Sequence, residues 1–262
     1  MAEHLNLYQR ARYYDIIFDR DVGREVDFIQ NAFRRYAGRT GPASVLDLAC
    51  GPGYHALEFA GRGVKATGLD LRAEMVELGQ EKAAARGLQL SWVQADMRTF
   101  KLPEPVDAAF TVFDGLDALL TNDDLVRHFN AVAENLTPGG IYLIDLSHPR
   151  DCSLARYGTF EYAGSLNGVQ VQIHWATNSP EHDLVTGVAE VELAMVIREN
   201  GNEKTVVDQA LERILDPQEI QLLCLLSGRL SPVGWHGDYD LAQPLDFSAA
   251  SRRMLAVLQR KD

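Results

Sequence analysis

Residues 45–60, Val-Leu-Asp-Leu-Ala-Cys-Gly-Pro-Gly-Tyr-His-Ala-Leu-Glu-Phe-Ala, combine a buried strand, a tight turn and a helix in one short span. The strand is an apolar run with a single acidic residue, Asp47. The turn is Gly51-Pro52-Gly53, where glycine lacks a Cβ and accepts positive φ, so a ligand can approach the backbone closely. A helical pattern follows, with Leu57 and Ala60 on one face. The stretch predicts a nucleotide-type cofactor site at the end of a first β-strand.

Strands and helices alternate around this stretch, which predicts a parallel sheet with helices on both faces. Two helices precede it, and a helix and two strands follow a long segment of different pattern. That later helix begins with Asp216-Pro217-Gln218-Glu219, an N-cap, a first-turn proline and an acidic third residue. The expected helices are 5–19, 22–36, 53–61, 72–86, 122–136 and 217–228, and the expected strands are 44–48, 64–69, 89–94, 107–113, 141–146, 231–239 and 252–259.

The intervening segment, from about 156 to 214, changes from a helical to a strand-like hydrophobic period. Apolar and polar residues alternate over 168–176 and 190–197. Asn200-Gly201-Asn202 then signals a hairpin turn, and 204–213 continues as a strand. We predict an antiparallel insertion of three or four strands.

Composition limits the classes of protein that the chain can represent. Its 262 residues suffice for one substantial domain with an insertion. The three cysteines are far apart and odd in number, so no disulfide framework is expected. The first ten residues lack the apolar core of a signal peptide, and no apolar run is long enough to cross a bilayer. We therefore expect a cytoplasmic protein.

Charge narrows the choice of partners. The chain has 37 acidic and 25 basic residues, a net charge of −12. Nucleic-acid binding depends on neutralising phosphates, so no nucleic-acid partner is expected, and a cationic or neutral small substrate suits the protein better than a polyanion. The seven histidines show no paired ligand spacing, so we expect no metal site. No membrane partner is expected, and we expect a monomer or homodimer.

Three acidic residues are placed where a ligand would bind. Asp47 lies inside the first strand, Asp70 ends the second, and Asp96 ends the third. These strand ends share one edge of a doubly wound sheet. A carboxylate after the second strand can accept hydrogen bonds from both ribose hydroxyls, and one after the third can accept from the adenine amine. The pattern Gly51-x-Gly53-x-x-Ala56 alone also fits a dinucleotide fingerprint, so an NAD-dependent oxidoreductase remains an alternative.

Taken together, these residues resemble the class I S-adenosylmethionine-dependent methyltransferases. The family's motifs are matched by Leu46-Asp47-Leu48-Ala49-Cys50-Gly51-Pro52-Gly53, Gly68-Leu69-Asp70-Leu71, Ala95-Asp96-Met97, Phe113-Asp114-Gly115-Leu116 and Leu136-Thr137-Pro138-Gly139-Gly140. The resemblance covers roughly 8–150 and returns for 216–260, where Gly237-Asp238-Tyr239-Asp240 resembles the family's late hairpin strand. It implies an α/β fold, a doubly wound, Rossmann-like sheet of seven strands with the last antiparallel, and S-adenosyl-L-methionine as the cofactor.

The resemblance also implies roles for individual residues. Ala49, Gly51 and Gly53 would let the backbone pass against the methionine and ribose parts of the cofactor. Asp70 would bind the ribose hydroxyls, and Leu71 would pack on adenine. Asp96 and the Met97 amide would form hydrogen bonds with the polar edge of adenine, and Tyr14 would close over the cofactor. The predicted cofactor-binding residues are Tyr14, Asp47, Ala49, Gly51, Gly53, Asp70, Leu71, Met75, Asp96, Met97 and Phe113.

Methyl transfer from a sulfonium depends mainly on alignment, and a base is optional for a neutral amine. The predicted catalytic residues are Asp114, His148 and Tyr13, with Asp117 and His236 as further candidates. Each has a structural alternative: a cap for Asp114 and Asp117, a loop hydrogen bond for His148, and core packing for Tyr13. Cys50 is interpreted as a small packing residue.

The same resemblance divides the chain into functional parts. Residues 1–40 would form a helical lid, and 41–150 with 215–262 the cofactor-binding domain. The insertion, 151–214, matches by position the antiparallel sheet of small-molecule N-methyltransferases, including those that act on amino sugars. It would serve as an acceptor lid or a dimer interface. The predicted function is methylation of a small molecule, with nitrogen favoured over oxygen. A non-catalytic cofactor-binding module is a further alternative.

Overall fold

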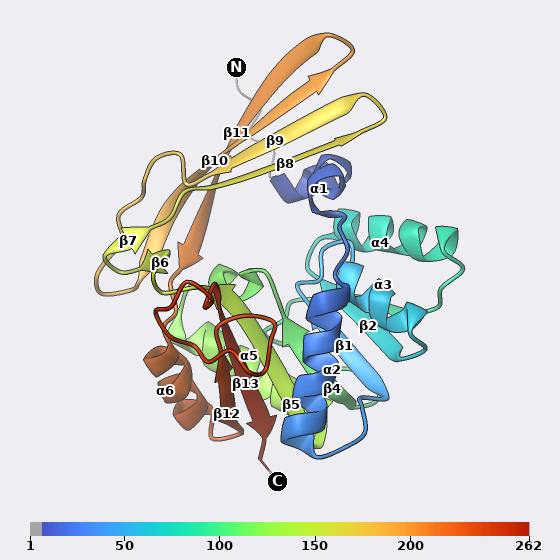
Figure 1. The fold of residues 1–262 in the computed structure, drawn as a ribbon, viewed down its shortest axis with the longest axis vertical. Helices are drawn as coiled ribbons and strands as arrows, with labels where there is room; N and C mark the ends of the chain where they lie inside the picture. The colour runs from blue at the N-terminus through green and yellow to red at the C-terminus, as the bar shows by residue number, and fades with distance from the viewer. Residues whose placement is uncertain (1–6, 262) are drawn as a thin grey trace.

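The main β-sheet has seven strands in the order β12-β13-β5-β4-β1-β2-β3 (Figure 1). The pairs β1–β2, β1–β4, β2–β3 and β4–β5 are parallel, whereas β13 runs antiparallel to both of its neighbours. This confirms the predicted doubly wound sheet with an antiparallel last strand. The computed structural model describes residues 7–261. The strands are Ser44–Leu48 (β1), Lys65–Asp70 (β2), Ser91–Gln94 (β3), Val106–Thr111 (β4), Leu136–Ser147 (β5), Leu230–His236 (β12) and Arg253–Arg260 (β13).

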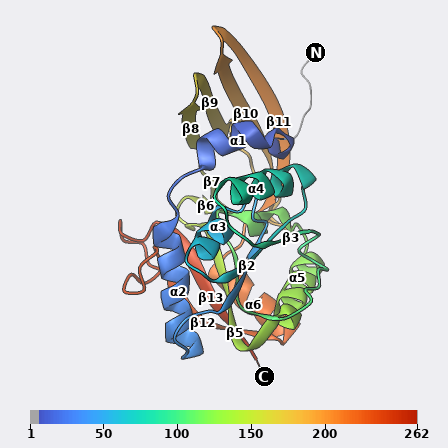
Figure 2. The same ribbon diagram turned by 90° about the vertical axis from the view of Figure 1, so that its right-hand side faces the viewer.

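Helices cover both faces of this sheet, with α2 on one side and α5 and α6 on the other (Figure 2). Two short 3₁₀ turns, Leu7–Arg10 (η1) and Gly115–Ala118 (η2), accompany them. No helix among residues 7–261 combines the length and apolarity needed to cross a bilayer. The α-helices are Ala11–Phe18 (α1), Gly23–Ala37 (α2), Tyr54–Gly61 (α3), Ala73–Ala85 (α4), Asn122–Asn135 (α5) and Pro217–Ser227 (α6).

Strand β1 supplies both halves of the hydrophobic core, because successive side chains of a strand point to opposite faces. Val45 packs with Phe33 of α2 and Phe59 of α3 on one face. Leu46 and Leu48 pack on the other face with side chains of α5 and α6. The strand is therefore buried on both faces, as parallel strands are.

A second, antiparallel sheet stands above the carboxyl ends of the main sheet (Figure 1). Its strand order is β11-β10-β9-β8, and a small hairpin, β6–β7, precedes it. The prediction of three or four strands is confirmed at four, and the short hairpin is an addition. The strands are Cys152–Ser153 (β6), Arg156–Tyr157 (β7), Phe160–Leu166 (β8), Val169–Trp175 (β9), Val188–Glu199 (β10) and Asn202–Arg213 (β11).

Helix α1 lies between this sheet and α4 (Figures 1 and 2). Phe18 packs into the inner face of the sheet beside Ile173 and Met195. The contact is close at Gly164 of β8, where a Cβ would come within 2.1 Å of the carbonyl oxygen of Ile16. The helix and the antiparallel sheet therefore share one small core above the main sheet.

Three local expectations differ from the structure. The first α-helix spans 11–18 rather than 5–19, and Leu5 lies outside the described residues. Strand β5 begins at Leu136 rather than 141, because β4 pairs with it from that residue. Residues 237–240 form a loop rather than a strand, because Asp238 is held by Arg252 and the backbone of Gly237 bonds to Gln243. The predicted capping of α6 is confirmed, with Asp216 and Glu219 forming a reciprocal capping box.

Candidate functional site

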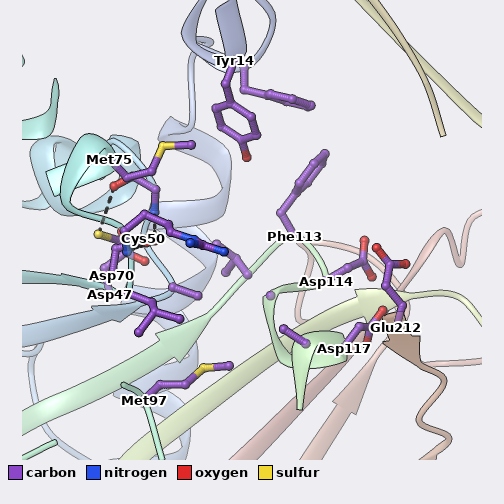
Figure 3. A pocket seen from close by; sticks show the side chains of 18 of the residues that line it. Tyr14, Asp47, Cys50, Asp70, Met75, Met97, Phe113, Asp114, Asp117 and Glu212 are labelled. Carbon is purple, nitrogen blue, oxygen red and sulfur yellow. Dashed lines mark hydrogen bonds between the residues drawn. The ribbon is translucent and has the colours of Figure 1, made fainter. Parts of the chain in front are cut away.

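A cavity of about 430 Å³ lies between the carboxyl ends of β1, β2 and β4 and the overlying antiparallel sheet. Open parallel sheets bind ligands at this edge. Figure 3 shows two groups of side chains in it, with Phe113 between them. We call the group formed by Tyr14, Asp47, Ala49, Cys50, Gly51, Asp70, Leu71, Met75, Asp96 and Met97 the glycine-turn side. We call the group formed by Asp114, Asp117, Tyr157, Tyr162, Trp175 and Glu212 the carboxylate side.

The turn after β1 has the left-handed backbone that its glycines predict. The φ angles are 52° at Ala49, 54° at Gly51 and 74° at Gly53. Ala49 and Gly51 line the cavity. Gly53 does not, because the indole of Trp92 in β3 packs against it, and a Cβ there would come within 2.5 Å of the ring. Gly53 thus shapes the turn from outside the cavity.

Asp70, at the end of β2, fixes the turn to the neighbouring strand. Its Oδ2 accepts from the Gly51 N–H and its Oδ1 from the Arg72 N–H, each at 2.8 Å. Burial raises the pKa of Asp70, and these two backbone donors oppose that shift. A carboxylate offers about four lone-pair sites, so Asp70 can still accept from a ligand in the cavity.

Asp47 lies deeper, inside β1, and is almost fully buried. Its Oδ2 accepts from the Ala56 N–H at 3.2 Å, and its Oδ1 has no hydrogen-bond partner. Burial raises its pKa well above the usual carboxyl range. Cys50 next to the turn donates its thiol to the Gly51 carbonyl at 3.3 Å, and burial raises its pKa well above that of a free thiol. Cys50 is therefore a thiol rather than a nucleophilic thiolate.

The far end of the glycine-turn side is largely apolar. Leu71 is 58% exposed at the cavity rim, whereas Met75 is buried beside Tyr14.

Asp96, which follows β3, forms an ion pair with Arg98. Arg98 donates to it from its backbone N–H and from its guanidinium, at distances of 2.6–3.0 Å. The Arg98 hydrogen bonds lower the pKa of Asp96. For Asp96 to accept from adenine as predicted, Arg98 must release part of this contact.

The exit of β4 holds two consecutive non-glycine residues with positive φ, Phe113 at 56° and Asp114 at 62°. Such backbone is strained and persists only where its surroundings fix it. Here Asp145 of β5 accepts from the Phe113 N–H at 2.9 Å. Asp114 accepts from the Ser147 N–H, and Arg253 bridges Asp145 at 2.7 Å and Asp114 at 3.1 Å. The strained turn directs Phe113 into the cavity (Figure 3).

The antiparallel sheet contributes the opposite wall. Glu212 of β11 accepts from the Tyr157 hydroxyl and, at 3.4 Å, from the Trp175 indole. Burial raises the pKa of Glu212 to about 7 and that of Asp117 well above its usual range. The sequence pointed to none of Tyr157, Trp175 and Glu212. The pattern of 204–213 predicted a strand but not which of its side chains would meet a ligand.

Three predicted acceptor-side residues lie outside the cavity. The ring of His148 is held by the Asp246 carbonyl at 2.9 Å, the Ser251 hydroxyl at 3.1 Å and the Arg150 N–H at 3.0 Å. His236 contacts the Tyr36 hydroxyl at 2.8 Å. Tyr13 packs against the small core of the antiparallel sheet. Asp114 and Asp117, by contrast, both line the cavity.

Residues 45–140 match the model of a family described as "Methyltransferase domain". A dTDP-3-amino-3,4,6-trideoxy-alpha-D-glucopyranose N,N-dimethyltransferase of Streptomyces venezuelae is 30% identical over 139 residues, 52% of this chain and 56% of the relative. The chain spans about half the length of the curated relatives it matches.

Solved structures match over nearly the whole chain. An S-adenosylmethionine-dependent methyltransferase from Clostridium acetobutylicum aligns with a TM-score of 0.77 at 19% identity, covering 98% of this chain and 100% of that one. An amino pentose methyltransferase from Micromonospora echinaspora, solved with S-adenosylmethionine bound, aligns with a TM-score of 0.71 at 19% identity, covering 100% and 99%. Residues 45–140 therefore match a methyltransferase domain, and the chain as a whole shares the fold of solved S-adenosylmethionine-dependent methyltransferases.

Proposed function

We propose that this protein transfers the methyl group of S-adenosyl-L-methionine to a nitrogen atom of a small-molecule acceptor. The observation that carries the proposal is the single cavity that joins the glycine-turn side to the carboxylate side. The cofactor would occupy the first, and the acceptor would occupy the second. Phe113 lies where the two meet (Figure 3).

The residues of the glycine-turn side fit this cofactor. Asp47 Oδ1 is buried without a partner, which suits the ammonium of the methionine part. Asp70 has lone pairs left for the ribose hydroxyls, and Leu71 offers exposed apolar surface for adenine. These roles, with those of Tyr14, Met97 and Phe113, remain proposals. The methyltransferase match favours this cofactor over the dinucleotide that the glycine pattern alone allowed.

The cofactor supplies an activated methyl group whose leaving group is a neutral thioether. The protein's own contribution is alignment, which supplies about 7–11 kcal/mol of a barrier in well-oriented intramolecular cases. The strained exit of β4, locked by Asp145 and Arg253, fixes one wall of the reaction space. The rings of Phe18, Phe113 and Tyr162, 5.2–5.7 Å apart by centroid, form an aromatic cluster beside the reaction space.

The acceptor class rests on two supports. By its name, the Streptomyces venezuelae relative dimethylates an amino sugar nucleotide, which favours nitrogen over oxygen. The insertion, 151–214, lines the cavity through Tyr157, Trp175 and Glu212, which favours an acceptor lid over a dimer interface. Of the predicted lid, 1–40, we assign only α1 to a cover over the cavity, because α2 packs on the main sheet, and we assign 41–150 with 215–262 to the cofactor-binding domain. A cytoplasmic location, a monomeric or homodimeric state and the absence of nucleic-acid and membrane partners rest on the sequence alone.

Calorimetric titration tests the cofactor. We expect S-adenosylhomocysteine to bind the purified protein with nanomolar-to-micromolar affinity, and NAD to give no heat of binding under the same conditions. Binding of NAD without S-adenosylhomocysteine would support the oxidoreductase alternative instead. If S-adenosylhomocysteine binds but a broad screen of small amines and alcohols yields no methyl transfer, the non-catalytic alternative gains support.

A further inference from the structure

The carboxylate side holds more carboxyl groups than the protein supplies cations for. Asp114, Asp117 and Asp145 lie around one guanidinium, that of Arg253, and Glu212 lies near Asp114 and Asp117. Arg253 pairs with Asp114 and Asp145. Among residues 7–261, no cationic side chain forms an ion pair with Asp117 or Glu212. Glu212 instead receives hydrogen bonds from two neutral donors, the Tyr157 hydroxyl and the Trp175 indole.

The arginines that line the cavity do not provide a cation for Asp117 or Glu212. Arg20 pairs with Glu25 at 2.6 Å, and Arg98 pairs with Asp96 at 2.6 Å and with Asp124 at 2.9 Å. Arg72 lies next to Asp70 on the glycine-turn side. A buried carboxyl group without a cation is costly to ionise and its pKa rises, and a bound cation would favour its charged form.

The walls of the cavity are also suited to a cation. Strand β11 packs against η2, which brings Glu212 towards Asp117. Figure 3 shows both carboxylates on the same side of the cavity as Asp114, across Phe113 from the cofactor residues. The rings of Phe113, Tyr157, Tyr162 and Trp175 surround them in the cavity lining. Aromatic faces attract ammonium groups, more strongly where water is excluded.

We propose that Glu212 and Asp117 bind the ammonium group of a cationic amine acceptor, and that Glu212 removes the proton that frees its lone pair. This inference rests on the proposed function and goes further by naming the charge of the acceptor and the residues that bind the charged group. Neutral alcohols and carboxylic acids would be poor ligands of this site. The aromatic rings would hold the carbon skeleton next to the amine.

The proposed step balances in atoms and charge. A proton passes from the acceptor R–NH₃⁺ to the Glu212 carboxylate, which leaves a neutral amine with a free electron pair. That pair forms the new N–C bond as the methyl group's S–C bond breaks, and the bonding electrons remain on sulfur as a neutral thioether. The product is R–NH₂⁺–CH₃, and the proton on Glu212 returns to solvent.

The surroundings of Glu212 suit a proton acceptor near neutral pH. Burial is the main cause that raises its pKa to about 7, and the hydrogen bonds from Tyr157 and Trp175 oppose that shift. The charged groups that face it across the cavity are Asp114 and Asp117, with Arg253 behind them. A general base works best when its pKa lies near the working pH.

A matched pair of probes tests the proposal without knowledge of the natural acceptor. Benzylammonium and benzyl alcohol have similar shapes and differ in charge. Each is titrated by ligand-observed NMR into protein saturated with S-adenosylhomocysteine. We expect benzylammonium to bind at least about tenfold more tightly at a pH near 8, from a charge-assisted hydrogen bond and cation–π contacts. The preference should shrink as the pH falls through about 7, because Glu212 gains a proton while the amine keeps its own.

Two variants and one control locate the effect. Glu212→Gln keeps the shape of the side chain and an acceptor oxygen for Tyr157 but loses the charge. We expect the variant's preference for benzylammonium over benzyl alcohol to fall below about threefold and to become independent of pH. Asp117→Asn should reduce the preference partially. The control is Glu190→Gln. Glu190 is exposed on β10 and is paired with Leu211, whereas Glu212 is paired with Ala189, so the side chains of Glu190 and Glu212 lie on opposite faces of the sheet. It should leave the preference unchanged.

The outcomes separate this proposal from the proposed function. Failure of S-adenosylhomocysteine to bind overturns both. If it binds, the present inference alone is overturned by equal affinity for the two probes, by no detectable binding of benzylammonium, or by a preference unchanged in Glu212→Gln. If Glu212→Gln fails to fold, as judged by its affinity for S-adenosylhomocysteine, an unchanged preference in Asp117→Asn overturns the inference.

Discussion

The two sides of the cavity are built in different ways. On the glycine-turn side, Asp70 and Asp47 accept three hydrogen bonds from backbone N–H groups. Two of these bonds span nine residues or fewer, and the third joins the turn after β1 to the end of β2. On the carboxylate side, contacts between side chains add to two hydrogen bonds from backbone N–H groups. Arg253 of β13 joins Asp114 and Asp145, more than 100 residues away in sequence, and Glu212 of β11 meets Tyr157 of β7.

This difference has a functional consequence. Backbone donors stay in place when surface residues vary, which suits a cofactor that never changes. Side chains supplied by an insertion can be exchanged without altering the main sheet, which suits an acceptor site. Fold and function are separable in this sense, because different sites can be carried by one scaffold.

The largest expected effect comes from breaking the carboxylate side at Arg253. Arg253→Met removes the cation between Asp114 and the fully buried Asp145. Loss of one partner of a buried ion pair destabilises by about 3–5 kcal/mol. Urea unfolding near pH 7 measures the effect. Arg253 opposes the burial that raises the pKa of Asp114, so in the variant that pKa rises further. The deficit should therefore shrink as the pH falls and Asp114 gains a proton.

The neighbouring Arg252 provides the control for this variant. Its guanidinium pairs with Asp238 at 2.7 Å, but its side chain is 63% exposed. Exposed pairs contribute about 0–1 kcal/mol, so Arg252→Met should change the free energy of unfolding little. Equal losses in the two variants would show that the Asp114–Arg253–Asp145 arrangement is not what fixes the β4 exit.

The contrast between the two sides explains what the sequence could predict. The order of strands, the turn after β1 and the carboxylate at the end of β2 follow from local patterns of a few residues. Asp114 and Asp117 could also be predicted as cavity residues, because they directly follow a parallel strand whose end lies at the ligand-binding edge of the sheet. The seven-stranded sheet with its antiparallel last strand came from the resemblance of these motifs to a known family.

What could not be predicted depends on contacts between distant segments. His148 looked like a candidate because it follows β5, but Asp246 and Ser251 of a later loop hold its ring outside the cavity. Glu212 is one of three acidic residues in β11. Its importance depends on how the antiparallel sheet is placed over η2, which no local pattern encodes.

On the glycine-turn side, the strongest test is Asp70→Ala. The variant should lose at least about 100-fold in affinity for S-adenosylhomocysteine, because two hydrogen bonds from ribose hydroxyls to a charged group contribute about 1.5–3 kcal/mol each. Calorimetry measures the change, and Asp123→Ala in the exposed first turn of α5 is the control. A loss smaller than about threefold would place the ribose elsewhere. Thermal unfolding should accompany the titration, because the Gly51 N–H also loses its acceptor.

A smaller effect tests whether Trp92 sets the geometry of the same turn. In Gly79→Ala, the new Cβ on α4 would come within 2.3 Å of the Trp92 ring and 3.0 Å of the Pro52 carbonyl oxygen. Overpacking of this kind costs about 1–3 kcal/mol, although alanine is normally the better helix former by about 1 kcal/mol. Gly61→Ala in α3 meets nothing within 4 Å and is the matched control, expected to stabilise by about 0.4–1 kcal/mol. Urea unfolding of the two variants should therefore show opposite signs. Two stabilising substitutions would mean that the indole can move, and that the shape of the turn comes from its glycines and Asp70 alone.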